Sequence, residues 1–313
     1  MVDWSSAALV FPGQGSQQVG MGKDLAQQYP AAAQLFEQAD QVLGFSFTKL
    51  CFEGPAEQLD ETINTQPALY VTGVATLRAI EAQLGSIKPL ATAGHSLGEL
   101  TALTAAGALP FEAGLKLVRE RGRLMKEAGE KSPGAMAALL GVEIADAQAI
   151  CEQASSQTGK PVVVANDNCP GQVVISGDAQ ALDSALAIAK ERGKRAIKLA
   201  VSIAAHSPLM AQSAEAFRAA LLQTPFVVPA LPIIGNVNAA PLRTREDIMT
   251  ELGAQLTSSV RWTESVQALQ ALGVKTFIEL GPKEVLTGLL KRIDRGATGI
   301  AVNSAEAIAA LAG

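Results

Sequence analysis

Residues 90–109 read LATAGHSLGELTALTAAGAL, and this stretch carries the strongest structural signal in the chain. A short apolar run, Leu90–Ala93, leads into Gly94–Gly98, which matches the pattern G-x-S-x-G. An alanine- and leucine-rich run, Glu99–Leu109, follows it. A strand that turns sharply into a helix needs glycine on both sides of the central residue, because side chains there would collide with neighbouring backbone. The stretch therefore predicts a strand, a tight turn exposing the hydroxyl of Ser96, and a buried helix.

Ser96 is the candidate nucleophile. At such a turn its hydroxyl lies at the carboxyl edge of the sheet, beside a helix N-terminus whose N–H groups can bind an oxyanion. The alternative is a structural turn serine, because G-x-S-x-G also occurs by chance. The strand-like run before the motif and the helical run after it favour the nucleophile.

The chain offers two histidines as the base that a serine hydroxyl needs. His95 neighbours Ser96, and we expect its side chain to point away from the serine and to pack within the fold. His206 lies in a loop just before Ser207-Pro208, a typical helix start, and we expect it to lie over the turn. Because no acid between Ser96 and His206 follows a strand in an obvious loop, we predict a Ser–His dyad oriented by a backbone carbonyl. A solvent-exposed His206 is the alternative.

A glycine-rich loop, Pro12–Gln17, follows the apolar run Ala7–Phe11. It lacks the lysine of a phosphate-binding P-loop, and Gln18 stands where G-x-G-x-x-G requires its third glycine. The loop can instead bring a backbone N–H beside the serine turn. We therefore predict that the N–H groups of Gln14 and Leu97 are the two oxyanion donors.

Alternating strands and helices on either side of this stretch predict an α/β protein with a mostly parallel sheet covered by helices. The middle of the chain reads β-α-β-β-α-β, the order of a ferredoxin-like unit. We therefore expect a large α/β domain, residues 1–131 and 202–313, interrupted by a small inserted domain, residues 132–201. Expected helices of the large domain cover 31–43, 67–84, 99–109, 111–128, 245–257, 262–272 and 283–292, and a further helix begins at Ser207-Pro208 and runs to about Gln223.

Composition excludes several classes of function. The 313 residues carry a net charge of −5 with both signs interspersed, which argues against a nucleic-acid surface. No run approaches the roughly 18 to 20 apolar residues that span a bilayer, and no signal peptide is apparent, so we expect a cytoplasmic protein without membrane contact. Two histidines and the distant Cys51, Cys151 and Cys169 predict neither a metal site nor disulfides.

Seven segments, taken together and in this order, resemble the malonyl-CoA:acyl carrier protein transacylases of fatty-acid synthesis. The resemblance covers essentially the whole chain and implies a hydrolase-like α/β domain with a ferredoxin-like insertion, acting without a cofactor on malonyl-CoA as a substrate. The segments are Phe11–Gln17, Thr65–Ala68, Gly94–Glu99, Arg119–Met125, Asn168–Val174, His206–Met210 and Glu279–Pro282.

The resemblance also implies roles for individual residues. Ser96 would take the malonyl group, with His206 as general base and acid. Arg121, which by itself reads as a solvated helix charge, would clamp the free carboxylate of malonate, because a planar guanidinium can meet a carboxylate with two parallel hydrogen bonds. Met125 would lie beside the acyl pocket, and the main-chain carbonyl of Gln255 would orient the histidine.

The implied reaction is a double displacement by a monomer. CoA leaves, and the pantetheine thiol of an acyl carrier protein then takes the malonyl group from the serine ester. Carrier proteins of this kind are usually acidic, so Lys194 and Arg195 are candidate contacts for the carrier or for CoA, with ordinary surface charges as the alternative reading.

Other functions stay open at this point. The family often has phenylalanine just before the histidine, and this chain has Ala205 there, so a roomier pocket could also admit methylmalonyl. The same chemistry could serve a polyketide synthase in trans or a malonate decarboxylase. A serine thioesterase or other hydrolase, and a non-catalytic domain that docks carrier proteins, are the readings outside this class.

Overall fold

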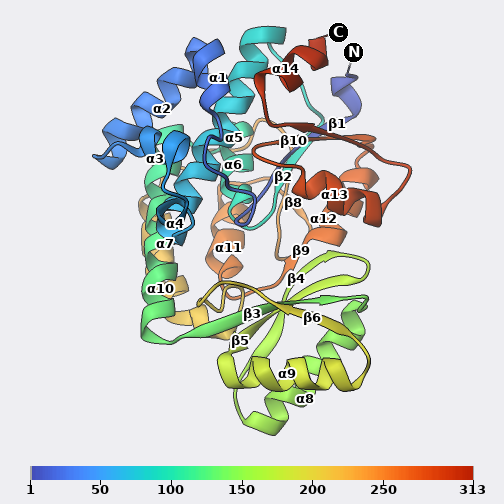
Figure 1. Ribbon diagram of the computed structural model, residues 1–313. Coiled ribbons are helices and arrows are strands. Elements are labelled where there is room, and N and C mark those ends of the chain that lie inside the picture. Colours follow the sequence, from blue (N-terminus) through green and yellow to red (C-terminus); the bar gives the residue numbers. More distant parts are fainter. Residues whose placement is uncertain (1, 313) are drawn as a thin grey trace.

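The computed structural model describes residues 2–312, which form two sheets with helices packed on them (Figure 1). The larger sheet has six strands in the order β11-β10-β1-β2-β7-β8. All neighbours run parallel except β7 and β8, which are antiparallel. The predicted mostly parallel sheet is therefore confirmed. Its strands are β1 (Ala7–Phe11), β2 (Ala91–Gly94), β7 (Ile233–Ile234), β8 (Pro241–Leu242), β10 (Thr276–Leu280) and β11 (Thr298–Val302).

Strand β1 shows why this sheet must be covered on both faces. Its residues are all buried; Leu9 and Phe11 belong to the core on one face, and Ala8 and Val10 to the core on the other. A strand that buries both of its faces reads as a continuous apolar run rather than an alternating one. Helices α12 (Trp262–Ala271) and α13 (Val285–Ile293) contribute to the second core.

The first core is built by a larger set of helices, of which α5, α6 and α7 pack on one another. Short 3-10 helices at Trp4–Ser6 and Pro208–Met210 complete the large unit. The helices are α1 (Lys23–Gln28), α2 (Pro30–Leu43), α3 (Phe47–Glu53), α4 (Ala56–Leu59), α5 (Thr62–Leu84), α6 (Gly98–Ala105), α7 (Phe111–Lys131), α10 (Ala211–Gln223), α11 (Arg245–Gln255) and α14 (Ala305–Ala312).

The smaller sheet contains the predicted β-α-β-β-α-β order, with the strands arranged β6-β3-β5-β4 and antiparallel throughout. Its two helices pack together against one face, below the sheet in Figure 1, and enclose a separate apolar core. Its elements are β3 (Gly134–Leu140), α8 (Ile144–Thr158), β4 (Val162–Cys169), β5 (Gln172–Asp178), α9 (Ala179–Glu191) and β6 (Arg195–Lys198).

A fifth strand of this sheet comes from outside residues 132–201, which the sequence did not predict. Strand β9 (Val260–Arg261) runs parallel to β4. The N–H of Arg261 also donates to the carbonyl of Asn236, 2.9 Å away, in the loop after β7. Thr263 donates to the carboxylate of Asp167 at 2.9 Å. The large unit therefore completes the small sheet.

Two helix boundaries differ from the prediction by four residues or more. Helix α5 begins at Thr62, so Pro67 lies inside it rather than in its first turn. A proline inside a helix leaves the carbonyl four residues earlier without its usual donor. Here the guanidinium of Arg119 donates to that carbonyl, of Ile63, at 2.8 Å. Helix α6 ends at Ala105, four residues before the predicted end, because Gly107 adopts a left-handed backbone with φ of 71°.

Within residues 2–312, no helix combines the length and apolar character needed to cross a membrane. The same part of the chain contains no group of three or more His, Cys, Asp or Glu side chains placed to hold a metal ion.

Candidate active site

Ser96 lies on the turn between β2 and α6, with a left-handed backbone at φ 52°. Close packing explains both glycines of the motif. A Cβ on Gly98 would lie 2.0 Å from the carbonyl oxygen of Phe11, and one on Gly94 would lie 1.9 Å from the carbonyl carbon of Gly98. Neither position can accept a side chain without moving backbone, so the sequence G-x-S-x-G follows from the turn itself.

The buried side chain of Asn236 fixes the backbone of this turn. Its Oδ1 accepts from the N–H of Ser96 at 2.7 Å, and its Nδ2 donates to the carbonyl of Gly94 at 2.7 Å. Because the two bonds bracket the turn, the amide holds the strained conformation of Ser96. No local sequence pattern indicated this residue, which lies in an irregular loop 140 positions further along the chain.

His206 is placed as a base for Ser96. Its Nε2 lies 2.8 Å from Oγ of Ser96, and its Nδ1 lies 2.8 Å from the main-chain carbonyl oxygen of Gln255. A carbonyl can only accept, so Nδ1 carries the hydrogen and Nε2 presents a lone pair to the hydroxyl. Burial lowers the pKa of His206 to about 3, with a further contribution from the charge of Arg121. The imidazole is therefore neutral near pH 7, as a base must be.

The other histidine has a different environment. Nε2 of His95 lies 2.8 Å from Oδ1 of Asn168 in β4, and its ring packs edge-on against Trp262 at 5.7 Å. His95 therefore links the serine turn to the small sheet.

Arg121 is buried in α7, with 1% of its surface exposed. Its NH1 donates to Oε1 of Gln66 at 2.9 Å, and its NH2 donates to Oε1 of Gln255 at 2.9 Å and to Oγ of Ser96 at 3.1 Å. Its Nε has no hydrogen-bond partner among residues 2–312. Burial lowers the pKa of Arg121 to about 10, so the guanidinium stays charged near pH 7. A fixed cation therefore stands beside the nucleophile.

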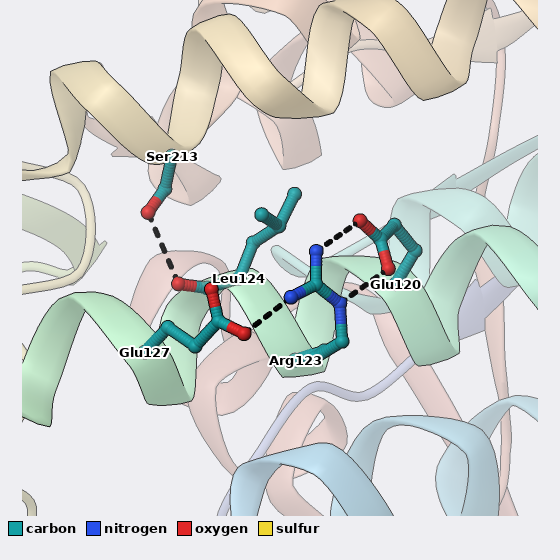
Figure 2. Close-up of polar contacts among 5 residues, drawn as sticks. All are labelled: Glu120, Arg123, Leu124, Glu127 and Ser213. Carbon is teal, nitrogen blue, oxygen red and sulfur yellow. Dashed lines mark hydrogen bonds and ion pairs between the residues drawn. The ribbon is translucent and has the colours of Figure 1, made fainter.

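Figure 2 shows other polar contacts made by residues of α7. Arg123 is held between Glu120 and Glu127 on the surface, and Oγ of Ser213 in α10 donates to the carbonyl of Leu124 at 3.0 Å. Arg121 and Arg123 are two residues apart, which places them on different sides of the helix. Arg121 therefore faces the site, and Arg123 faces solvent.

A cavity of about 330 Å³ between the two sheets joins these groups. Ser96, His206 and Arg121 line it, together with Met125. Apolar side chains of the small sheet and of the loop after it form the opposite wall; these are Met136, Ala138, Val174, Leu199, Val201, Ile203 and Ala205. The arrangement suits a short acyl chain that carries a negative charge at its far end.

The two predicted oxyanion donors also line this cavity. Leu97 directly precedes α6, and Gln14 lies in the glycine-rich loop after β1. Within the described residues, neither N–H donates to another backbone carbonyl. Both groups are therefore available to an oxygen that develops negative charge.

Lys194 and Arg195 do not line the cavity. Nζ of Lys194 donates to the carbonyl of Gly141 at 3.3 Å and lies 3.6 Å from the carboxylate of Asp146. Arg195 is exposed at the start of β6. Their contact with a carrier protein or CoA stays a prediction.

The site also contains a buried carboxylate that the sequence analysis missed. Glu99 has no exposed surface, and its Oε2 accepts from Nε2 of Gln255 at 2.5 Å. An acid in the first turn of a helix ordinarily reads as a partner of the helix dipole at the surface. Only its position directly after the serine motif distinguished it.

A serine nucleophile, a neutral imidazole and a buried cation on a hydrolase-like α/β fold define a serine acyltransferase or hydrolase. The acyl transferase domain family matches residues 8–307. The chain is 46% identical over 305 residues to the malonyl CoA-acyl carrier protein transacylase of Bacillus subtilis (strain 168), covering 97% of this chain and 95% of that one. The chain therefore belongs to the acyl transferase family and, within it, to the malonyl-CoA:acyl carrier protein transacylases.

Solved structures agree with this assignment. An acyl carrier protein S-malonyltransferase from Vibrio cholerae matches with a TM-score of 0.94 at 43% identity, covering 98% of this chain and 100% of that one. A malonyl-transacylase solved in complex with its type II PKS acyl-carrier protein matches with a TM-score of 0.94 at 40% identity, covering 97% and 98%. The protein is an acyltransferase, and its predicted fold class and family are confirmed.

Proposed function

We propose that this enzyme transfers a malonyl group from CoA to the pantetheine thiol of an acyl carrier protein, through an ester on Ser96, in fatty-acid synthesis. The observation that carries the proposal is the position of Oγ of Ser96, 2.8 Å from the imidazole of His206 and 3.1 Å from the guanidinium of Arg121. A hydrolase has no general need for a buried cation at this place. The carboxylate of a malonyl group would be the anionic partner of the Arg121 guanidinium.

In the first half-reaction, Nε2 of His206 takes the proton of the Ser96 hydroxyl as Oγ attacks the thioester carbonyl. The N–H groups of Gln14 and Leu97 stabilise the tetrahedral oxyanion. The C–S bond then breaks, and the imidazolium returns the proton to the departing CoA sulfur. The product is a malonyl-serine ester and free CoA.

The second half-reaction reverses the roles. The pantetheine thiol gives its proton to His206 and attacks the ester carbonyl; the C–O bond breaks, and Oγ of Ser96 recovers the proton. No redox step or cofactor is required. Because one chain supplies every group named here, we propose that the enzyme works as a monomer. We also propose that it works in the cytoplasm.

Arg121 sets the substrate class in this proposal. A carboxylate that meets a buried guanidinium through parallel hydrogen bonds is held in one orientation, which places the thioester carbonyl over Ser96. Ala205 lines the same cavity with a small side chain, so we propose that methylmalonyl is also accepted, as a slower substrate.

Intact-protein mass spectrometry tests the proposal. Wild-type enzyme incubated with malonyl-CoA should gain the mass of one malonyl group, and Ser96→Ala should gain none. Addition of a holo carrier protein should move that mass to the carrier. Rapid release of free malonate without a carrier would instead establish a hydrolase, and a wild type that gains no mass would indicate a docking domain.

A further inference from the structure

The mechanism proposed above gives no role to Glu99, although this side chain lies beneath the site. It stands in the first turn of α6, three residues after Ser96, and has no exposed surface. Nε2 of Gln255 donates to its Oε2 at 2.5 Å. A buried carboxyl group is costly to the fold unless its contacts compensate for lost hydration. The hydrogen bond to Gln255 therefore connects Glu99 to the site.

The amide of Gln255 has one orientation that satisfies all its neighbours. Its Oε1 accepts from NH2 of Arg121 at 2.9 Å, while its Nε2 donates to the carbonyl of Ser96 at 3.0 Å as well as to Glu99. Exchange of the two ends would place the NH₂ group against a guanidinium and the oxygen against two acceptors. Glu99 is thus one of three groups that define this orientation.

Gln255 contacts the site through its backbone too. Its main-chain carbonyl accepts from Nδ1 of His206 at 2.8 Å. The residue ends α11, so its side chain fixes the position of a carbonyl at a helix terminus. A single residue therefore contacts the base, the cation and the backbone of the nucleophile, and its side chain is tied to Glu99.

We propose that Glu99 is a positioning residue which, through the side chain of Gln255, sets the poses of both His206 and Arg121. The proposal rests on the function proposed above. Glu99 touches no reacting atom, yet it contributes in this way to the selectivity for acyl groups that end in a carboxylate.

The surroundings of Glu99 suggest a conservative replacement. Burial, and then the nearby carboxyl of Glu251, raise the pKa of Glu99 well above its ordinary value. Glu251 is itself engaged, because its Oε1 accepts from the N–H of Val237 at 2.7 Å. A carboxyl group and a primary amide have nearly the same shape, and both present an acceptor oxygen. Glu99→Gln therefore keeps the bond to Gln255, whereas Glu99→Leu fills similar space and removes it.

A double-mutant cycle tests the proposal. The variants are Glu99→Leu, Gln255→Leu, which keeps the main-chain carbonyl, and the double variant, with Glu99→Gln as the conservative control. The rate of Ser96 acylation is measured by quenched-flow mass spectrometry with malonyl-CoA and, separately, with acetyl-CoA. Thermal unfolding of each variant is recorded in parallel.

We expect Glu99→Leu to slow malonyl acylation by about 10- to 100-fold, because small displacements of positioned groups have effects of that size. Acetyl acylation should fall less, because acetyl lacks the carboxylate that Arg121 holds. Glu99→Gln should restore most of the malonyl rate. The double variant should be no slower than the slower single variant, because both changes break the same link.

Additive losses in the double variant, or equal losses with malonyl and acetyl in Glu99→Leu, would overturn the proposal. If Glu99→Leu does not fold, Gln255→Leu carries the test, and an unchanged malonyl-to-acetyl ratio in that variant would overturn it. A wild type that accepts no malonyl group would refute the proposed function as well. A labelled wild type with an unaltered Glu99→Leu ratio would refute this inference alone.

Discussion

Replacement of Arg121 by alanine should abolish the preference for malonyl over acetyl groups. The guanidinium is already buried and held by Gln66 and Gln255, so little further ordering is needed when a carboxylate arrives. Two charge-assisted hydrogen bonds contribute about 1.5–3 kcal/mol each, or about 3–6 kcal/mol together. That range corresponds to about two to four decades in relative rate.

Desolvation of the substrate carboxylate offsets part of this gain, so the lower half of the range is the expected result. The assay measures mass labelling of Ser96 over time with malonyl-CoA and acetyl-CoA separately. Malonyl labelling should fall by about two to three decades in Arg121→Ala, while acetyl labelling persists. The ratio of the two rates cancels any general damage to the serine and histidine.

Arg123→Ala is the matched control. This residue lies on the same helix, and its partners are the surface carboxylates of Glu120 and Glu127 (Figure 2). Exposed ion pairs contribute about 0–1 kcal/mol, so the ratio should not change. Equal losses of malonyl and acetyl labelling in Arg121→Ala, or no loss of either, would refute the carboxylate clamp.

Further predictions concern the base, the turn and the pocket. Because burial lowers the pKa of His206 from 6.5 to about 3, the acylation rate of wild type should stay level from about pH 8 to about pH 5, and a fall centred near 6.5 would contradict this assignment. Below pH 6.5 the histidine is protonated in the unfolded chain but stays neutral in the folded one. The free energy of unfolding should therefore decrease as pH falls from 6.5 towards 3, which urea titrations can measure. Gly98→Ala should lower the free energy of unfolding by about 3 kcal/mol or more, because its Cβ would lie 2.0 Å from the carbonyl oxygen of Phe11. The control is Gly288→Ala on an open helix face, which should raise the free energy of unfolding by about 0.5–1 kcal/mol in the same assay. Ala205→Phe should lower the ratio of methylmalonyl to malonyl labelling by about tenfold or more, and an unchanged ratio would show that this wall does not limit acyl size.

The serine turn could be predicted from sequence because its determinants are local. The steric demand for Gly94 and Gly98, the apolar run before them and the helical run after them all lie within twenty residues. The base followed from scarcity, since only His95 and His206 were available. The β-α-β-β-α-β order of the small unit was equally readable, because strand-like and helix-like segments follow one another there in that order.

Other parts of the site depend on contacts between distant segments. Glu99 and Asn236 are polar residues whose local sequence predicts a solvated position, and only tertiary packing buries them. Pro67 is a local signal for a helix start, yet packing extends α5 five residues before it, and Arg119 compensates the freed carbonyl. The burial of Arg121 could not be derived from its helix, and its role came from the resemblance alone.

Strand β9 has a mechanical consequence for how the enzyme exchanges its two substrates. Its backbone bonds fasten β4 on one side and the loop that carries Asn236 on the other, so the walls of the cleft share one short piece of main chain. A hinge motion that separates the two walls would require those backbone hydrogen bonds to break. Donor thioester and acceptor thiol are therefore expected to react in a cleft whose two walls keep their relative position.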